Sequence, residues 1–297
     1  MASTSDIHIV PISIDDILQQ LSVGITPART AINNVIDSMH APRDITRLLY
    51  HILFNNTSML SIEDYQYEDN YYFIILLKCL RYNTSIVQLK FYVKMDDDVM
   101  KEFSTMLGHN RYIKKVDILS PISQHSEEYL IDALKMNTSL IELFIYSPEK
   151  EPNEMNNHFF IQNILKYLKL NTTITTLAIY DIHEINVNHI CDILIHNNTL
   201  ERLYINYCDI NADDVNKIIS CLKYNTNLLT LNLYRNSSDI DTINVIADVL
   251  KYNNTINTIF IDFVNDPSDV IDDEVNDNNI NSKERKKSDF LSRFDFL

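Results

Sequence analysis

Apolar residues recur along this chain in a frame whose spacing changes once in each repeat. They first stand four positions apart, as at Leu76 and Leu80, which is the spacing of one face of a helix. An asparagine, Asn83, follows three positions later. Beyond it the apolar residues stand two apart, as at Leu89 and Phe91, which is the spacing of a short strand with one buried face. The pattern predicts a helix, a turn at the asparagine and then a short strand.

This frame occurs eight times, and its asparagine marks each occurrence. The markers are Asn56, Asn83, Asn110, Asn137, Asn171, Asn197, Asn225 and Asn253, at intervals of 27, 27, 27, 34, 26, 28 and 28 residues. A leucine stands three residues before every one of them. Such a period predicts stacked repeats, because one unit cannot bury its apolar face without neighbours.

Helix starts and turns also have sequence signals. Ser126 and Asn211 precede helical stretches and are expected to be N-caps. Glycine is nearly absent, since only Gly24 and Gly108 occur, so we expect Asn and Asp to occupy turn positions with positive φ.

The segments LKYNTNLLTLNLYRN (222–236) and LKMNTSLIELFIY (134–146) resemble the leucine-rich repeat of the ribonuclease-inhibitor-like subclass. The resemblance covers residues 45–264 and implies an α/β leucine-rich-repeat solenoid, or horseshoe, of about eight units of short parallel strand plus helix. It also implies that strands line the concave side and that the repeat asparagine satisfies backbone groups at its turn. The family often carries Asn or Cys three residues after the last apolar strand position, and in this chain only Cys208 and Asn236 match.

We divide the chain into three parts. Residues 1–44 are an N-terminal helical cap with helices at 12–21 and 28–39, residues 45–264 are the leucine-rich-repeat domain, and residues 265–297 are an acidic tail expected to be disordered. The one long interval reflects an insertion at 147–158, with three Glu and one Lys. A tolerated surface loop and a binding edge both explain it.

Composition narrows the function classes. The net charge of −16 disfavours nucleic acid as a partner, because a phosphate-binding face needs clustered Lys and Arg. The four cysteines form no CxxC pair, so neither a metal nor a cofactor is expected. With no signal peptide and no apolar run of about 20 residues, we expect a cytoplasmic protein without membrane contact.

Counting residues from each repeat asparagine also identifies positions on the predicted concave strand face. The ninth residue after each marker is Tyr65, Tyr92, Leu119, Tyr146, Tyr180, Asn206, Tyr234 or Asp262, so five of the eight are tyrosine. A row of tyrosines suits protein recognition, and stacking between rings on neighbouring strands is the alternative explanation; both can hold together. The predicted partner-binding residues are Tyr65, Tyr92, Tyr146, Tyr180, Tyr204, Tyr234, Phe144 and Phe260.

The sequence contains no HExxH motif, no GxSxG motif and no phosphate-binding glycine loop, so no catalytic residue is predicted. The favoured function is a non-enzymatic protein–protein interaction module that binds its partner on the concave face. The alternative is a regulatory protein such as a small-GTPase-activating protein of the Ran type, with Arg235 as the functional arginine, by analogy of fold alone. The helix–Asn–Thr segments also look similar to the repeats of actin-capping tropomodulin.

Overall fold

The computed structural model describes residues 13–54, 56–63, 70–92, 95–120, 122–147 and 161–262. The chain divides into two units, Met1–Phe263 and Val264–Leu297, and all described residues belong to the first. The predicted tail (265–297) and the predicted insertion beyond Ser147 therefore lie outside the described residues.

Eight short strands form one sheet, in which each strand pairs in parallel with the next strand in sequence. They are β1 (Met59–Glu63), β2 (Gln88–Tyr92), β3 (Lys115–Leu119), β4 (Glu142–Tyr146), β5 (Thr176–Tyr180), β6 (Arg202–Asn206), β7 (Thr230–Asn232) and β8 (Thr258–Phe260). From β2 onward, the register pairs residues that share one place in the predicted frame, such as Leu89 with Val116 and Ile118 with Ile145. The sheet therefore reproduces the repeat.

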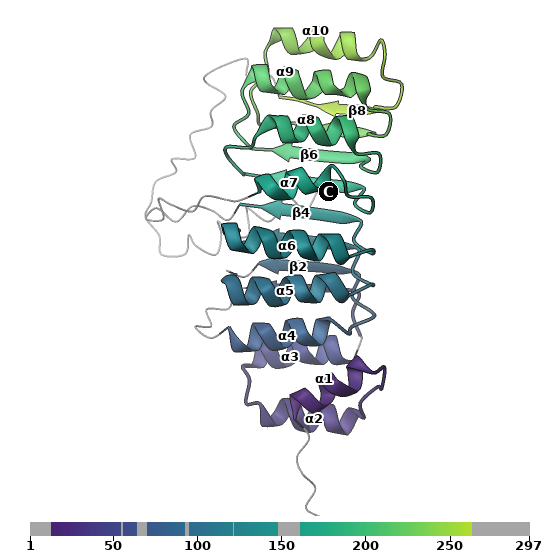
Figure 1. Cartoon of the computed structure of the whole chain (residues 1–297). Helices are drawn as coiled ribbons and strands as arrows, with labels where there is room; N and C mark the ends of the chain where they lie inside the picture. Colours follow the sequence, from purple (N-terminus) through teal and green to yellow (C-terminus); the bar gives the residue numbers. More distant parts are fainter. Residues whose placement is uncertain are drawn as a thin grey trace, which may run out of the picture. The chain divides into compact units, whose positions relative to one another are not determined.

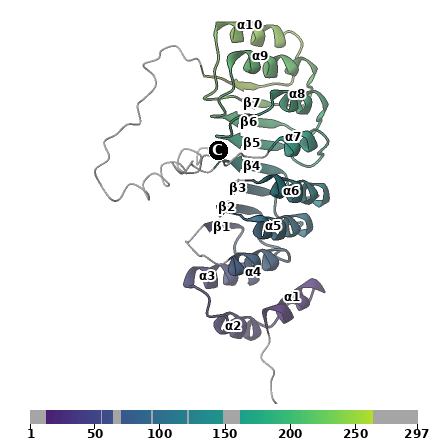
Figure 2. The ribbon, with the colours of Figure 1, turned by 60° about the vertical axis from the view of Figure 1, so that its left-hand side comes forward.

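Helices alternate with these strands and lie along one side of the sheet, as Figure 2 shows for α5 to α8. The helices are α1 (Ile14–Ser22), α2 (Arg29–Ser38), α3 (Arg43–Leu53), α4 (Tyr71–Leu80), α5 (Asp97–His109), α6 (Gln124–Met136), α7 (Gln162–Leu168), α8 (Val187–His196), α9 (Ala212–Cys221) and α10 (Ile240–Val249). Consecutive helices follow one another in the order of their strands (Figure 1). This arrangement confirms the predicted fold class, an α/β solenoid of parallel strands and helices.

The core lies between the two layers and uses the positions that the frame predicts. From Asn83 to Asn225, the residues six and eight after the asparagine are buried, for example Val116 and Ile118 at 0% exposure, whereas Ile259 and Ile261 after Asn253 are partly buried. The leucines three before the asparagine are at most 3% exposed from Leu80 to Leu222. Leu250 differs, because half of its surface is exposed.

The observed helix starts confirm one of the two predicted N-caps. Asn211 caps α9 as predicted, since its side chain accepts a hydrogen bond from the N–H of Asp214 at 2.9 Å. The prediction for Ser126 is wrong, because α6 begins at Gln124 and its N-cap is Ser123. Ser126 instead lies inside the first turn, where its N–H donates to the Ser123 hydroxyl at 3.1 Å.

The first unit is offset from the others. Its strand pairs Met59 with Gln88 and Glu63 with Tyr92, so the connection from α3 to β1 is two residues shorter than the frame requires. Asn56 is consequently exposed, with its side-chain oxygen 2.9 Å from Nδ1 of His51, and it does not turn inward as predicted.

The chain re-enters the repeat after the long interval through Glu127 of α6. The buried carboxylate of Glu127 accepts hydrogen bonds from the N–H groups of Asn163 (2.6 Å) and Ile164 (3.1 Å) and from the Asn163 side chain (2.7 Å). Helix α7 has no side-chain cap from its own N-cap residue, Ile161. Glu127 therefore supplies the acceptor that the start of α7 needs.

Candidate functional site

Seven of the repeat asparagines, from Asn83 to Asn253, are structural and at most 6% exposed. Asn110 shows the pattern: its Oδ1 accepts from the N–H groups of Tyr112 (2.8 Å) and Ile113 (2.9 Å). Its Nδ2 donates to the carbonyl oxygens of Leu80 (2.9 Å) and Asn83 (3.0 Å) in the preceding unit. The side chain thus closes its own turn and ties it to the neighbouring unit, which satisfies a buried amide completely.

Most of the series repeats this bond to the preceding unit. The residues whose Nδ2 donates to a carbonyl of the preceding unit are Asn83, Asn110, Asn137, Asn197, Asn225 and Asn253. Asn171 keeps the bonds of its Oδ1 to the N–H groups of Thr173 and Ile174. Within the described residues, its Nδ2 makes no hydrogen bond to the preceding unit. The exception coincides with the 34-residue interval.

The strand face away from the helices carries the side chains at the fifth, seventh and ninth positions after each asparagine, and we call it the outer strand face. The predicted binding residues divide there into two groups. Phe144, Tyr146, Tyr180 and Tyr204 are only 2–9% exposed, so the prediction that they form an exposed row is wrong. Tyr234 (40%) and Phe260 (52%) are exposed, and Tyr92 is half-buried.

Ring stacking accounts for part of this burial. The rings of Tyr146 and Tyr180 are 4.9 Å apart and inclined by only 6°, a distance set by the spacing of paired strands. Phe144 adds a further ring 6.4 Å from Tyr146, and the Lys115 ammonium lies 4.0 Å from the Phe144 ring centroid. The alternative explanation for the tyrosines, stacking that stabilises the sheet, therefore holds at the centre of this face.

Tyr65 lies outside the described residues. The count of nine residues from the asparagine also fails in this unit, because Glu63 is the residue that pairs with Tyr92. The two-residue offset of β1 explains the error, since the count from Asn56 overshoots the strand.

Asp117 is an acid on the outer strand face that is only 3% exposed. Burial raises its pKa to about 6, while Lys115 and Lys90 act in the opposite direction. Among the described residues, its Oδ1 has no hydrogen-bond partner. The sequence places Asp117 on this face, but no sequence signal indicates its burial, which depends on the surrounding side chains.

Arg202 is an exposed residue of the outer strand face that the predicted site omitted. Its side chain is 45% exposed, and it lies on β6 beside Tyr204. Arg235 follows β7; its side chain is 47% exposed, with its guanidinium 5.6 Å from the Tyr234 ring and its Nε 3.9 Å from the Asp262 carboxylate. An arginine five residues after a repeat asparagine is the signal by which Arg202 could have been found.

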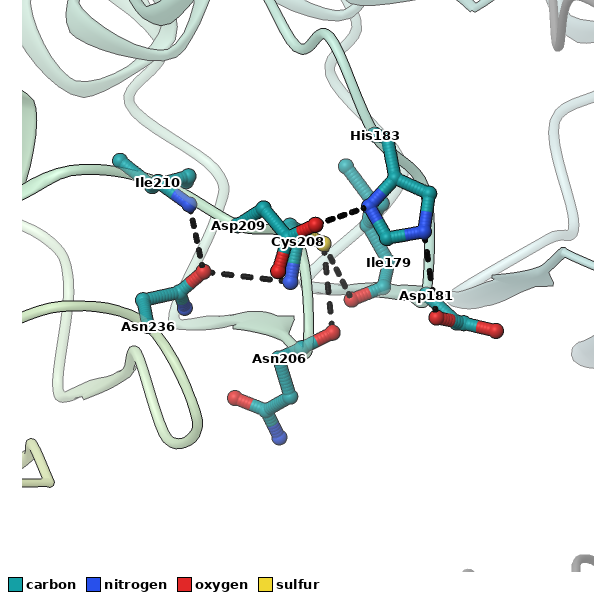
Figure 3. Close-up of polar contacts among 8 residues, drawn as sticks. All are labelled: Ile179, Asp181, His183, Asn206, Cys208, Asp209, Ile210 and Asn236. Carbon is teal, nitrogen blue, oxygen red and sulfur yellow. Dashed lines mark hydrogen bonds and ion pairs between the residues drawn. The ribbon is translucent and has the colours of Figure 1, made fainter. Parts of the chain in front are cut away.

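A histidine, a cysteine and two aspartates gather where β5 and β6 end (Figure 3). Nδ1 of His183 is 2.9 Å from the Asp209 carboxylate, and its Nε2 is 3.6 Å from that of Asp181. The Cys208 thiol instead donates to the main-chain oxygen of Asn206 at 3.2 Å. Burial raises the pKa of this thiol to about 12, so it is not an activated nucleophile.

Asn236 holds the same edge together, as Figure 3 shows. Its Oδ1 accepts from the N–H groups of Cys208 and Ile210, both at 3.2 Å. Its Nδ2 donates to the carbonyl oxygens of Ile205 (2.7 Å) and Leu233 (3.0 Å). Cys208 and Asn236, the two matches to the family position, are thus buried structural residues.

The turns at this edge use positive φ at one repeated position, the tenth after the asparagine. Asp181, Tyr207 and Arg235 have φ of 57°, 59° and 58° there. The prediction that Asn and Asp fill such positions is therefore wrong in part. The described non-glycine residues with positive φ are His40, Asp181, Glu184, Tyr207, Asp209 and Arg235, so Asp accounts for two and Asn for none.

Among the described residues, no group of three or more His, Cys, Asp or Glu side chains is placed to hold a metal ion. In the same part of the chain, no helix has the length and apolar character that crossing a membrane requires.

Comparison with protein-family models finds no match, and comparison with curated proteins finds none either. Among solved structures, the chain is similar to one described as "Leiomodin-1 Actin-Binding Site 2 (ABS2)", with 22% sequence identity and a TM-score of 0.38. The similarity covers 47% of this chain and 80% of that chain. A likeness of this extent supports no inference about function, and the ribonuclease-inhibitor-like subclass stays a prediction.

Proposed function

We propose that this chain is a non-enzymatic protein-interaction module, and that its partner binds the exposed part of the outer strand face over β6 to β8. The observation that carries the proposal is the exposure of Arg202, Tyr234 and Phe260 on or beside these strands. Arginine and large aromatic side chains contribute most to protein–protein binding, because they combine large contact area with a polar or charged end.

The contrast between the two faces of the sheet supports this proposal. On the inner face the frame repeats nearly the same aliphatic residues from strand to strand. The outer seventh position instead varies in size, charge and polarity along the register: Lys90, Asp117, Phe144, Ala178, Tyr204, Asn232 and Phe260. A uniform scaffold that presents a varied surface is typical of solenoids that bind proteins.

The local structure holds Tyr234 in place. Its N–H donates to the side-chain oxygens of Asn206 (3.1 Å) and Asn232 (3.0 Å), and its ring lies 5.9 Å from that of Tyr207. An anchor ordered before binding loses less conformational entropy when the partner arrives.

The test is a double variant, Arg202→Glu with Tyr234→Ser, compared with the wild type in affinity capture from the native cell and mass spectrometry. We expect the specific partner to be lost. The matched control is Lys101→Glu with Tyr112→Ser, which changes one exposed base and one exposed tyrosine on and just after α5. Equal capture by the wild type and the Arg202/Tyr234 variant would refute binding at this face.

No observation within the described residues favours the GTPase-activating alternative, since Arg235 is paired with Asp262 and lies over Tyr234. If the alternative were correct, Arg235→Ala would abolish stimulated GTP hydrolysis in a panel of small GTPases.

A further inference from the structure

Two cysteines of neighbouring helices meet on the helix side of the sheet. Cys191 lies on α8 and Cys221 is the last residue of α9, and these two helices pack side by side (Figure 1). The thiol groups of Cys191 and Cys221 form a hydrogen bond with each other. One turn earlier the same helices are joined again, because Nζ of Lys217 donates to the side-chain oxygen of Asn188 at 2.7 Å. Two separate contacts therefore hold Cys191 against Cys221.

This contact joins two fixed places in the repeat frame. One place lies six residues before the asparagine of a unit, and the other lies four residues before the asparagine of the next unit. The preceding pair of units has Leu165 and Ile193 at these places, and the following pair has Ile219 and Val249, all of them buried. Aliphatic residues are thus sufficient for packing there, and the two thiols bring a chemistry that packing does not need.

The surroundings make one thiol more acidic than the other. The hydrogen bond from Cys221 lowers the pKa of the Cys191 thiol; the Lys217 ammonium acts in the same direction, and burial, Asp192 and Asp214 act against it. The same hydrogen bond raises the pKa of the Cys221 thiol, because that thiol is the donor. Cys191 therefore supplies the thiolate, which is the nucleophilic form of cysteine. Cys221 is half-buried, so the pair lies within reach of a small oxidant.

We propose that Cys191 and Cys221 are a peroxide-oxidation site, at which an intramolecular disulfide joins α8 to α9. The Cys191 thiolate attacks one oxygen of hydrogen peroxide, the O–O bond breaks, and the sulfur becomes a sulfenic acid while the leaving hydroxide takes up a proton to form water. The Cys221 thiol then attacks the sulfenic sulfur. The S–S bond forms, the S–O bond breaks, and the hydroxide leaves with the proton of Cys221 as a second water. The cysteine pair loses two electrons, and the peroxide gains them.

The structure favours this disulfide over other pairings of the cysteines. A disulfide sets its sulfur atoms about 2.05 Å apart, so two hydrogen-bonded thiols need only a small further approach. Cys79 and Cys208 are 1% and 2% exposed, and burial raises the pKa of each thiol to about 12. Neither Cys191 nor Cys221 belongs to the outer strand face, so this inference does not rest on the proposed function.

The test treats the folded full chain with hydrogen peroxide, blocks the remaining thiols with N-ethylmaleimide in denaturant and identifies the cysteine peptides by mass spectrometry. We expect a peptide pair linked through Cys191 and Cys221, which separates on reduction, while Cys79 and Cys208 carry the maleimide. On a non-reducing gel the product should run as a single chain. The same treatment in urea should give a mixture of pairings, because only the fold brings these two thiols together.

Single variants separate the two roles. Cys221→Ser removes the thiol that resolves the intermediate, so Cys191 should accumulate as a sulfenic acid that dimedone labels. Cys191→Ser removes the attacking thiolate and should leave Cys221 with less dimedone label than Cys191 has in the first variant. Cys79→Ala is the control and should form the disulfide as the wild type does.

Far-ultraviolet circular dichroism checks that each variant folds. The wild-type chain tests the proposal even where a variant does not fold. Absence of the Cys191–Cys221 link in the folded wild type, or a link between two chains in its place, would overturn the proposal.

Discussion

At the scale of the residue, asparagine is suited to its repeated position because one amide has both an acceptor and two donors. Asn137 uses them fully: Oδ1 accepts from the N–H groups of Ser139 and Leu140, while Nδ2 donates to the carbonyls of Leu107 and Asn110. Aspartate lacks the donor and would bring a buried charge. The recurrence of asparagine therefore follows from the number of backbone groups that need a partner.

We predict that Asn110→Ala lowers the free energy of unfolding by about 3 kcal/mol, because it leaves two N–H groups and two carbonyls of a buried turn without that partner. Urea denaturation followed by circular dichroism measures the change. Asn56→Ala is the control: Asn56 is exposed and outside the series, so its loss should cost less than about 1 kcal/mol. Similar losses for the two variants would contradict the structural role of Asn110.

Asp117 should make stability depend on pH. Its pKa is raised to about 6 in the folded chain, above the ordinary value of 3.8, so the folded state binds the proton more tightly than the unfolded state. The favourable contribution of Asp117 to the stability of the folded state is present below pH 3.8 and is lost as the pH rises through 6. The shift in pKa corresponds to a change of at most about 3 kcal/mol in the free energy of unfolding between low and high pH.

We therefore expect Asp117→Asn to stabilise the protein relative to the wild type, by more at pH 8 than at pH 5. Urea denaturation at both values measures the difference between variant and wild type. Asp132→Asn serves as the control, since the Asp132 side chain is 71% exposed. A difference between Asp117→Asn and wild type that stays constant with pH would refute the raised pKa.

At the scale of the element, α7 shows how a helix can begin without its own cap. The helix spans only Gln162–Leu168, and its first N–H groups find their acceptor on another helix, at Glu127. The carboxylate also faces the positive end of the α7 dipole. This contact joins residues 36 positions apart, so no local sequence pattern reports it.

Glu127→Ala should destabilise the protein by about 1–3 kcal/mol, since it removes a charged acceptor from buried N–H groups. Hydrogen exchange should show the largest loss of protection at Asn163 and Ile164. Glu128→Ala changes the neighbouring exposed acid and should leave this protection unchanged. Unaltered exchange at α7 in the Glu127 variant would contradict the capping role.

At the scale of the whole molecule, periodicity predicts what every unit shares. The alternation of helix and strand, the buried strand positions such as Leu203 and Ile205, and the inward Asn197 all follow from spacing alone. These features repeat because each unit meets the same neighbour, so one frame describes them all.

Periodicity fails where a unit differs from the others. The shorter connection before β1 moves the strand by two residues, although Asn56 and Leu53 keep the frame. On the outer strand face, spacing identifies Tyr180 correctly as an outward residue and offers stacking on a neighbouring tyrosine as one explanation, but it does not reveal that Tyr146 and Tyr180 are buried. Exposure there depends on side chains from several units, which one unit's sequence does not specify.

The unmatched amide of Asn171 has a consequence for how the chain can change length. Across intervals of 26 to 28 residues the asparagine still reaches a carbonyl of the unit before, as Asn197 and Asn225 do. Between β4 and β5 the strands remain paired, as Leu143 with Leu177, while Asn171 has no such bond to lose within the described residues. Segments of different size can therefore be accommodated at this junction while β4 and β5 on either side of it stay paired.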